Sequence, residues 1–227
     1  MNHLSLTILL IVLINLIGYV YSYLIVTNRV GPNRQIQPNA IRDKKYLSSH
    51  TYLFAINVCT LIFFVFIGFY FFKDYMIDLN TEFSYLNLFV QLFIILIFDD
   101  TFFYFLHRSM HENKYIYKKI HKIHHRANAP MPIDYLYVHP LEWMSGFIGP
   151  FIGILLLGGV SIYAFWLYLI VRNLHELDIH SGLKSSFLNR LFPFSGSNEH
   201  HDLHHAKRDG NYSSTFTLWD IIFKTKL

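Results

Sequence analysis

Cysteine and charged side chains are both scarce in this chain of 227 residues. The single cysteine, Cys59, lies within an apolar run, which excludes a disulfide scaffold and a thiolate metal site. Charged residues make up 15% of the sequence, whereas a soluble domain of this size carries about 25%. This deficit indicates a surface that faces lipid. The net charge of +4 comes from cations in loops, without the aromatic motifs of RNA-binding proteins, so we expect no nucleic-acid partner.

Long apolar runs take the place of the missing charge. The three runs that can cross a bilayer as single helices are residues 4–26, 52–72 and 85–106. At about 1.5 Å per helical residue, each spans a hydrocarbon core of roughly 30 Å. A fourth run, residues 147–171, is interrupted by Gly149-Pro150 and by Gly158-Gly159. Its halves are too short to cross singly, so we expect a helical hairpin that enters and returns, with a single crossing as the alternative.

The charges of the loops predict the orientation. Between the first two runs lie Arg29, Arg34, Arg42, Lys44 and Lys45. Between the second and third runs, Lys73 stands against Asp74, Asp78 and Glu82. By the positive-inside rule the first loop is cytoplasmic and the second is not, which places the segment after residue 106 on the cytoplasmic face. A returning hairpin would keep everything after residue 171 there too. No Pro-, Gly- or Ser-rich linker divides the chain, so we expect one membrane domain over residues 1–227.

Histidine is concentrated in the second half of the chain, where twelve of the fourteen histidines follow residue 106. The clusters are His107 and His111 in HRSMH, His121, His124 and His125 in HKIHH, His201, His204 and His205 in HDLHH, and a looser pair, His175 and His180. Residues three or four apart share a helix face, so we expect each cluster to present its imidazoles toward one point. For His3, His50 and His200 we expect surface or satisfied core positions instead.

Neutral imidazole is the commonest side-chain metal ligand, and this set is too large for one ion but suits two. Zinc and iron both accept such ligands, so the clusters predict metal without deciding which metal. The fold that these patterns predict is all-α: an integral membrane helical bundle with a cytoplasmic, histidine-rich helical cap.

Carboxylates inside an apolar segment are costly and usually functional, and Asp99 and Asp100 lie inside the third run. Asp100 is a candidate to accept the ring N–H of a metal-binding histidine from another segment, which would fix that histidine's tautomer. The alternative is that both carboxylates mark the point where the helix leaves the lipid. Glu142 and Asp178 are further candidates for the same orienting role.

Six segments carry a resemblance to a known family: DDTFFYFLHRSMH, HKIHHRANAP, YVHPLEW, LDIHSG, HHDLHH and GNYSSTFTLWDIIF. Their order and spacing resemble the fatty acid hydroxylase/sterol desaturase superfamily. Within it the chain is most similar to the C-4 methylsterol oxidases, which share the His-Pro-Leu-Glu step at 139–142 and the ending at 211–220. RQIQPN near Arg34 resembles a step in that family's first loop. The resemblance covers roughly residues 30–223 and departs at FKTK, where the family has Phe-Gly-Thr-Asp.

The resemblance implies a non-haem di-iron lipid mono-oxygenase or desaturase that uses O2 to hydroxylate or oxidise a lipid C–H bond, in the first place a sterol C-4 methyl group. Electrons would come from a separate NAD(P)H-dependent carrier, because the chain stops at Leu227 without a carrier domain. Carried over by position, the ligands are His107, His111, His121, His124, His125, His180, His201, His204 and His205, with His175 as a tenth and His139 as its competitor. The membrane would be the endoplasmic reticulum in a eukaryote and the inner membrane in a bacterium.

Chemistry supports this implication, because breaking an alkyl C–H bond lies beyond side-chain acids and bases and needs a metal. Within the superfamily, a fatty acid or sphingolipid hydroxylase and a sterol desaturase are the alternatives. From another class, a membrane-embedded zinc hydrolase would use Glu112, Glu176 or Glu199 as a general base. A metal transporter fits less well, because the histidine clusters follow the apolar runs instead of lying within them.

Overall fold

Three long apolar helices form the part of the fold that could span a membrane. The computed structural model describes residues 2–78, 83–185 and 194–227. The long helices are α1 (His3–Val26), α2 (Lys44–Ile67) and α4 (Tyr85–Glu112). Each begins where a polar side chain accepts a hydrogen bond from a backbone N–H of the first turn: Asn2 for α1, Asp43 for α2 and Ser84 for α4. A π-helical turn, η1 (Gly68–Phe72), extends α2 into α3 (Lys73–Met76).

The stretches His3–Val26, Lys44–Met76 and Tyr85–Glu112 are each long and apolar enough to cross a membrane, and they contain the three predicted runs. Large apolar side chains cover their outward faces, among them Leu16, Phe63 and Phe93, whose exposed fractions are 55%, 58% and 60%. A soluble helix would place polar residues on that face. The outer surface of the bundle is therefore suited to lipid.

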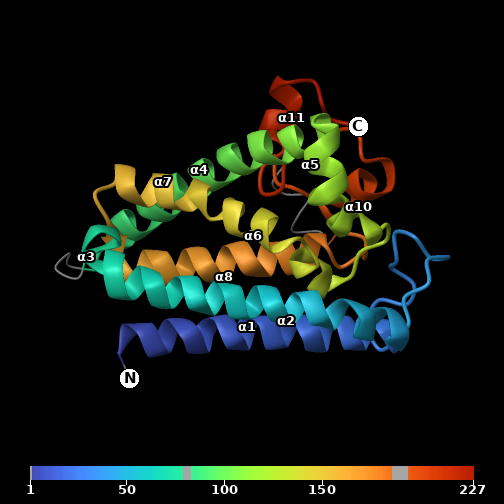
Figure 1. Ribbon diagram of the computed structural model, residues 1–227, viewed down its shortest axis with the longest axis horizontal. Coiled ribbons are helices and arrows are strands. Elements are labelled where there is room, and N and C mark those ends of the chain that lie inside the picture. Colours follow the sequence, from blue (N-terminus) through green and yellow to red (C-terminus); the bar gives the residue numbers. More distant parts are fainter. Residues whose placement is uncertain (1, 79–82, 186–193) are drawn as a thin grey trace.

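The fourth apolar run forms two helices that lie in opposite directions. Helix α6 (Pro140–Gly146) leads into α7 (Ile148–Leu156), and the chain then reverses into α8 (Ile162–Ile179) (Figure 1). The reversal uses Gly158 and Gly159, whose φ angles of 68° and 103° disfavour other residues. After it, β2 (Val160–Ser161) pairs in parallel with β1 (Ile77–Asp78). A hairpin requires such a reversal, but its depth in the bilayer stays a prediction.

Helix α7 packs closely on α4 because glycines face it. A Cβ atom added at Gly149 would lie 2.9 Å from the Cα of Asp99, and one at Gly153 would lie 3.2 Å from the Cα of Ile95. These contacts leave no room for a side chain. The sequence predicted that Gly149 interrupts a helix. In the structure Gly149 instead allows α7 and α4 to pack closely.

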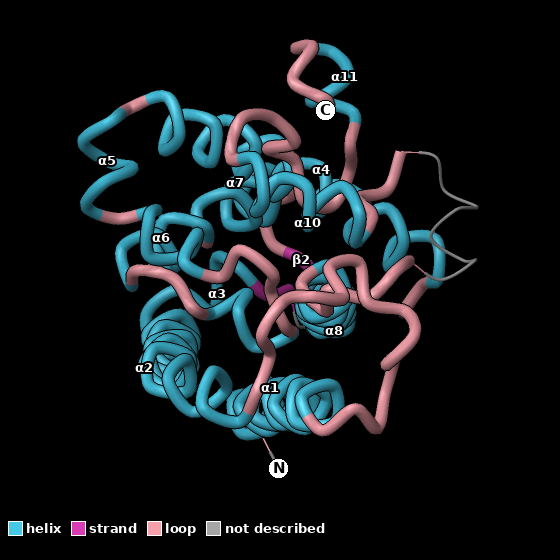
Figure 2. The backbone as a smooth tube through the Cα atoms, turned by 90° about the vertical axis from the view of Figure 1, so that its right-hand side faces the viewer, coloured by secondary structure: helices cyan, strands magenta, loops and turns pink. Residues whose placement is uncertain are grey.

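Short helices gather at one end of the bundle and form the cap. They are α5 (Lys114–Lys119), the 3₁₀ helices η2 (His121–Arg126) and η3 (Pro132–Leu136), α10 (Asn198–Lys207) and α11 (Leu218–Ile222). Figure 2 looks along α1, α2 and α8 from this end. In the described residues, strands are limited to β1 and β2, of two residues each, so the all-α prediction is confirmed.

Candidate metal centre

Nine of the predicted histidines meet in the cap, in two adjacent groups. The first group is His107, His111, His121, His125 and His204, and the second is His124, His180, His201 and His205. Within each group, the candidate ligand nitrogens all lie within 4.8 Å of one another. The ring centroids of His125 and His205, one from each group, are 5.0 Å apart. Helix α4, η2, the end of α8 and α10 each contribute.

Two of the sequence clusters contribute histidines to both groups. The sequence analysis predicted instead that all imidazoles of one cluster point toward one position. In HKIHH, His124 belongs to the second group and its neighbour His125 to the first. In HDLHH, His204 and His205 divide in the same manner. Consecutive helical residues point about 100° apart, so each helix supplies ligands to both groups and joins them.

Hydrogen bonds to oxygen decide the tautomer of four imidazoles. The acceptors are the Tyr212 carbonyl for His107 Nδ1 at 2.7 Å, Glu142 Oε1 for His121 Nδ1 at 2.8 Å, the Gly210 carbonyl for His204 Nδ1 at 2.8 Å and the Glu176 carbonyl for His180 Nδ1 at 2.9 Å. These oxygens accept, so Nδ1 carries the proton in each ring. A neutral imidazole has one N–H, and the Nε2 of each therefore presents a lone pair.

The Nε2 atoms of the first group crowd together. His121 Nε2 lies 3.1 Å from His107 Nε2, 2.8 Å from His111 Nε2 and 2.9 Å from His125 Nε2. In the second group, His201 Nε2 lies 2.9 Å from His180 Nε2 and 3.1 Å from His205 Nε2. The Nε2 atoms of His107 and His121 both present lone pairs, which repel at this distance unless a cation lies between them. Two imidazole nitrogens at right angles about a metal, each about 2.1 Å from it, are about 3.0 Å apart.

Protonation of the imidazoles does not supply that cation near pH 7. Burial lowers the pKa of both His121 and His124 to about 3. Burial, together with repulsion from neighbouring imidazoles, also holds the pKa values of His201, His204 and His205 well below the ordinary range. The rings are therefore neutral near pH 7, which is the form that binds metal. The described residues thus fit two metal ions held by nitrogen.

The predicted carboxylates have three different surroundings. Glu142 contacts His121, as described above. Asp100 Oδ1 instead accepts the backbone N–H groups of Thr215 and Phe216 at 2.8 and 3.1 Å, so it ties the C-terminal segment to α4. Asp178 Oδ1 lies 3.5 Å from the side-chain nitrogen of Asn198, at the start of α10. The orienting role stays a prediction for all three residues.

Both candidates for a tenth ligand lie outside the two groups. His175 Nε2 donates to the Ser214 carbonyl at 3.1 Å. His139 caps α6, its Nδ1 accepting from the backbone N–H of Leu141 at 3.1 Å.

The histidines expected to have other roles do have other partners. His50 Nδ1 lies 2.6 Å from Asp134 Oδ1 in the core, and buried His200 Nε2 lies 3.2 Å from Asp220 Oδ2. The ring of His3 packs edge-on against Trp166, with the centroids 5.9 Å apart.

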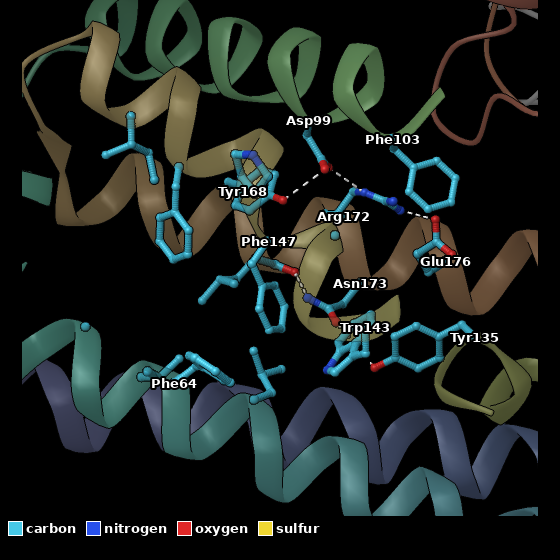
Figure 3. A pocket seen from close by; sticks show the side chains of 18 of the residues that line it. Phe64, Asp99, Phe103, Tyr135, Trp143, Phe147, Tyr168, Arg172, Asn173 and Glu176 are labelled. Atoms are coloured by element: carbon cyan, nitrogen blue, oxygen red, sulfur yellow. Dashed lines mark hydrogen bonds and ion pairs between the residues drawn. The ribbon is translucent and has the colours of Figure 1, made fainter. Parts of the chain in front are cut away.

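A buried network of charged side chains connects Asp99 of α4 with Glu176 of α8 (Figure 3) and from there reaches His180 of the second group. Only some of its residues were candidates from the sequence. Asp99 Oδ2 accepts from Arg172 Nε at 2.6 Å and from the Tyr168 hydroxyl at 3.1 Å. Arg172 also binds Glu176, whose second oxygen lies 3.5 Å from His180 Nδ1. Arg172 was not among the candidates from the sequence. Its spacing of four residues from Glu176, at the edge of an apolar run, could have indicated this ion pair.

An apolar cavity opens from the histidines into the bundle. His107, His121 and His124 of α4 and η2, with His180 and His201, line its inner end. Phenylalanines from four helices form much of the remaining wall: Phe64, Phe103, Phe147, Phe151 and Phe165. Figure 3 shows several of these side chains between α2, α4, α6 and α8. An apolar molecule in this cavity would lie against imidazoles of both groups.

Comparisons with known proteins identify the family of this chain. The family model described as fatty acid hydroxylase matches residues 92–225. The chain is 47% identical to methylsterol monooxygenase 1 of Rattus norvegicus over 131 residues, which are 57% of this chain and 44% of the relative. It is 38% identical over 163 residues to methylsterol monooxygenase 1 of Danio rerio, covering 70% and 55% of the two chains.

A fungal relative, methylsterol monooxygenase erg25B of Aspergillus fumigatus, is 38% identical over 141 residues, which are 60% of this chain and 47% of the relative. The chain thus spans about half the length of the curated relatives it matches. No solved structure matches it.

Proposed function

Because this chain belongs to the fatty acid hydroxylase family, we propose that it is a membrane-bound, O2-dependent oxidoreductase that hydroxylates or oxidises a lipid C–H bond. The observation that carries the proposal is the pair of buried, neutral histidine groups at the end of an apolar cavity. Apolar helices on the outside bring the cavity within reach of bilayer lipids.

The proposed cofactor is a pair of iron ions, one in each group, with the nine clustered histidines as ligands. Iron bound there supplies the O2-dependent oxidising chemistry that side chains lack. The protein's own contribution is to orient the ligands and to exclude water. Glu142 would hold the His121 ring through Nδ1–H, and the apolar wall would keep the C–H bond to be oxidised in a dry site. Zinc is a possible substitute in the same nitrogen sites.

The proposed substrate is a sterol carrying a methyl group at C-4. The relatives named above are methylsterol monooxygenases. Rings such as Phe64, Phe103 and Phe147 offer flat contact area to a rigid apolar skeleton. A fatty acid or sphingolipid hydroxylase and a sterol desaturase are the alternatives within the family.

The test uses purified protein in lipid nanodiscs, stripped with a chelator and reloaded with iron or with zinc. With iron, a chemical reductant and O2, we expect oxidised 4-methylsterol, with one oxygen atom from labelled O2 in each new hydroxyl. The zinc-loaded protein and the anaerobic sample should give less than about 1% of that product, because zinc has no redox chemistry. If the zinc-loaded protein hydrolysed a lipid ester as fast under nitrogen as in air, the zinc hydrolase would instead be favoured.

The separate electron carrier is proposed to dock on the cap. Exposed cations on α5 and η2 are Lys114, Lys118, Lys119, Lys122 and Arg126. Beneath them the ring of Tyr117 lies 5.4 Å from that of His111 and 6.1 Å from that of His121, measured between centroids. A carrier with an acidic face would be steered to this surface and brought close to the first histidine group. By the loop charges, this face is cytoplasmic.

Reversing charge on this surface should slow electron delivery without changing the centre. In the double variant Lys118→Glu/Lys119→Glu, we expect turnover with an acidic carrier protein to fall about tenfold at low ionic strength. The loss should shrink as salt is added, because screening weakens steering. Turnover with a small chemical reductant should stay unchanged. The matched control is Lys44→Glu/Lys45→Glu at the exposed start of α2; an equal loss there would argue against a docking surface on α5.

A further inference from the structure

The cavity wall contains two unsatisfied polar atoms on one short helix. Outside the two histidine groups, the described lining residues with a buried polar atom that has no hydrogen-bond partner are Glu142, through Oε2, and Trp143, through Nε1. They are consecutive residues of α6. The feature is thus one donor and one acceptor, side by side in the sequence, on the cavity wall.

Tyr135, Tyr168 and Arg172, which also line the cavity, already have hydrogen-bond partners. Tyr168 and Arg172 donate to Asp99. The Tyr135 hydroxyl donates to Asn15 at 2.7 Å. The α6 pair therefore differs from these groups in that neither atom has a hydrogen-bond partner among the described residues. A buried N–H without an acceptor is unfavourable, and an apolar ligand would leave it so.

A hydroxyl group matches both atoms, because it accepts one hydrogen bond and donates another. A ketone could satisfy only the Trp143 N–H, and a hydrocarbon neither atom. The pair therefore favours a lipid alcohol over a lipid without oxygen.

The location of the pair relates this polar group to the carbon that is oxidised. Glu142 Oε1 binds His121, a member of the first histidine group, so a single imidazole ring would separate α6 from a metal held by that group. The Trp143 ring is held edge-on between Tyr135 and Phe147, with centroid distances of 5.9 and 5.2 Å (Figure 3). A lipid anchored by its hydroxyl at α6 would present the carbons next to that hydroxyl to the metal site, and not its far end.

We propose that Trp143 is a specificity-determining residue whose Nε1–H binds the hydroxyl oxygen of the lipid substrate, with Glu142 Oε2 as the acceptor for the hydroxyl proton. This inference rests on the proposed function and deepens it, because it names the residues that would bind the hydroxyl group of the proposed sterol.

The experiment compares a 4-methylsterol with its 3-deoxy analogue, which has hydrogen in place of the hydroxyl. Equilibrium binding of each labelled lipid to detergent-solubilised protein is measured for the wild type and for Trp143→Phe. We expect the wild type to bind the alcohol about tenfold more tightly, and Trp143→Phe to lose most of that preference while binding the deoxy lipid within about twofold of the wild type. In turnover, the same variant should raise KM for the alcohol more than it lowers kcat.

The matched control is Trp166→Phe, since the Trp166 indole N–H already donates to Thr7 at 2.8 Å and the residue is not part of the cavity wall. It should keep the wild-type preference. Equal wild-type affinity for the two lipids would overturn the inference, even if Trp143→Phe failed to fold. So would an equal loss of both affinities in Trp143→Phe. Selective binding without oxygen-dependent product would overturn the proposed function alone, because the binding assay needs no turnover.

Discussion

Replacing His204 by alanine is expected to abolish the proposed lipid oxidation and to empty at least one of the two proposed metal positions. The His204 ring lies among those of His107, His111 and His125, with centroid distances of 4.5 to 4.8 Å. Its Nδ1 is bound to Gly210, and its buried Nε2 has no hydrogen-bond partner in the protein. Loss of a ligand exceeds the 10- to 100-fold effect of losing a residue that orients one. We therefore expect turnover to fall by more than about 100-fold.

The measurement combines iron per chain, by atomic absorption, with product formation in nanodiscs. His200→Ala is the matched control, because His200 is a buried histidine one turn away on the same helix and lies outside both groups. Its nearest acidic partner is Asp220, and its loss should cost stability while both metal positions stay filled. Full iron content and near-normal turnover in His204→Ala would remove it from the ligand set. Membrane insertion of both variants is expected to be normal.

Arg172→Leu is expected to destabilise the protein by about 3–5 kcal/mol, the usual effect of removing one partner from a buried ion pair. Arg172 binds both Asp99 and Glu176. Its side chain is 14% exposed, and those of Asp99 and Glu176 are 4% and 12% exposed. Leucine would leave two carboxylates in a largely apolar environment without a counter-charge. Tryptophan fluorescence during thermal unfolding in detergent micelles would measure the effect.

The matched control for this prediction is Arg108→Leu. Arg108 also pairs with a glutamate four residues later, Glu112, but the two side chains are 31% and 59% exposed. An exposed pair of this kind is worth less than about 1 kcal/mol. The two variants have the same sequence spacing and differ in burial. If both variants lower the unfolding temperature equally, the buried ion pairs of Arg172 with Asp99 and Glu176 stabilise the fold no more than an exposed pair does.

Much of the candidate site was predictable from local spacing. Eight of the nine clustered histidines lie in three sequence clusters with spacings of three or four residues, which share a helix face. His180 was a candidate only through a looser pair with His175 and the family resemblance. Local spacing could not show that His124 and His125 belong to different groups. That division depends on where α4, α8 and α10 lie around η2. For the same reason, His175 remained a ligand candidate although its ring faces the Ser214 carbonyl.

The carboxylates show the same limit. Asp99 and Asp100 were noticed because charge in an apolar run is costly. Their partners, Arg172 and the backbone of Thr215 and Phe216, lie 73 and more than 110 residues away in the chain. The sequence likewise could not predict that the N–H of Trp143 lacks a hydrogen-bond partner. An atom is known to lack a partner only when all of its neighbours in space are known.

The sequence by itself determined the apolar helices, the all-α class and the residue types of the metal centre. Hydropathy and helical spacing are local properties, and each is complete within one segment of the chain. Only the tertiary structure decided how the imidazoles divide into two groups, which carboxylate meets which cation, and which polar atoms face the cavity unbound. Those features depend on the directions of side chains from helices distant in the sequence, and packing sets these directions.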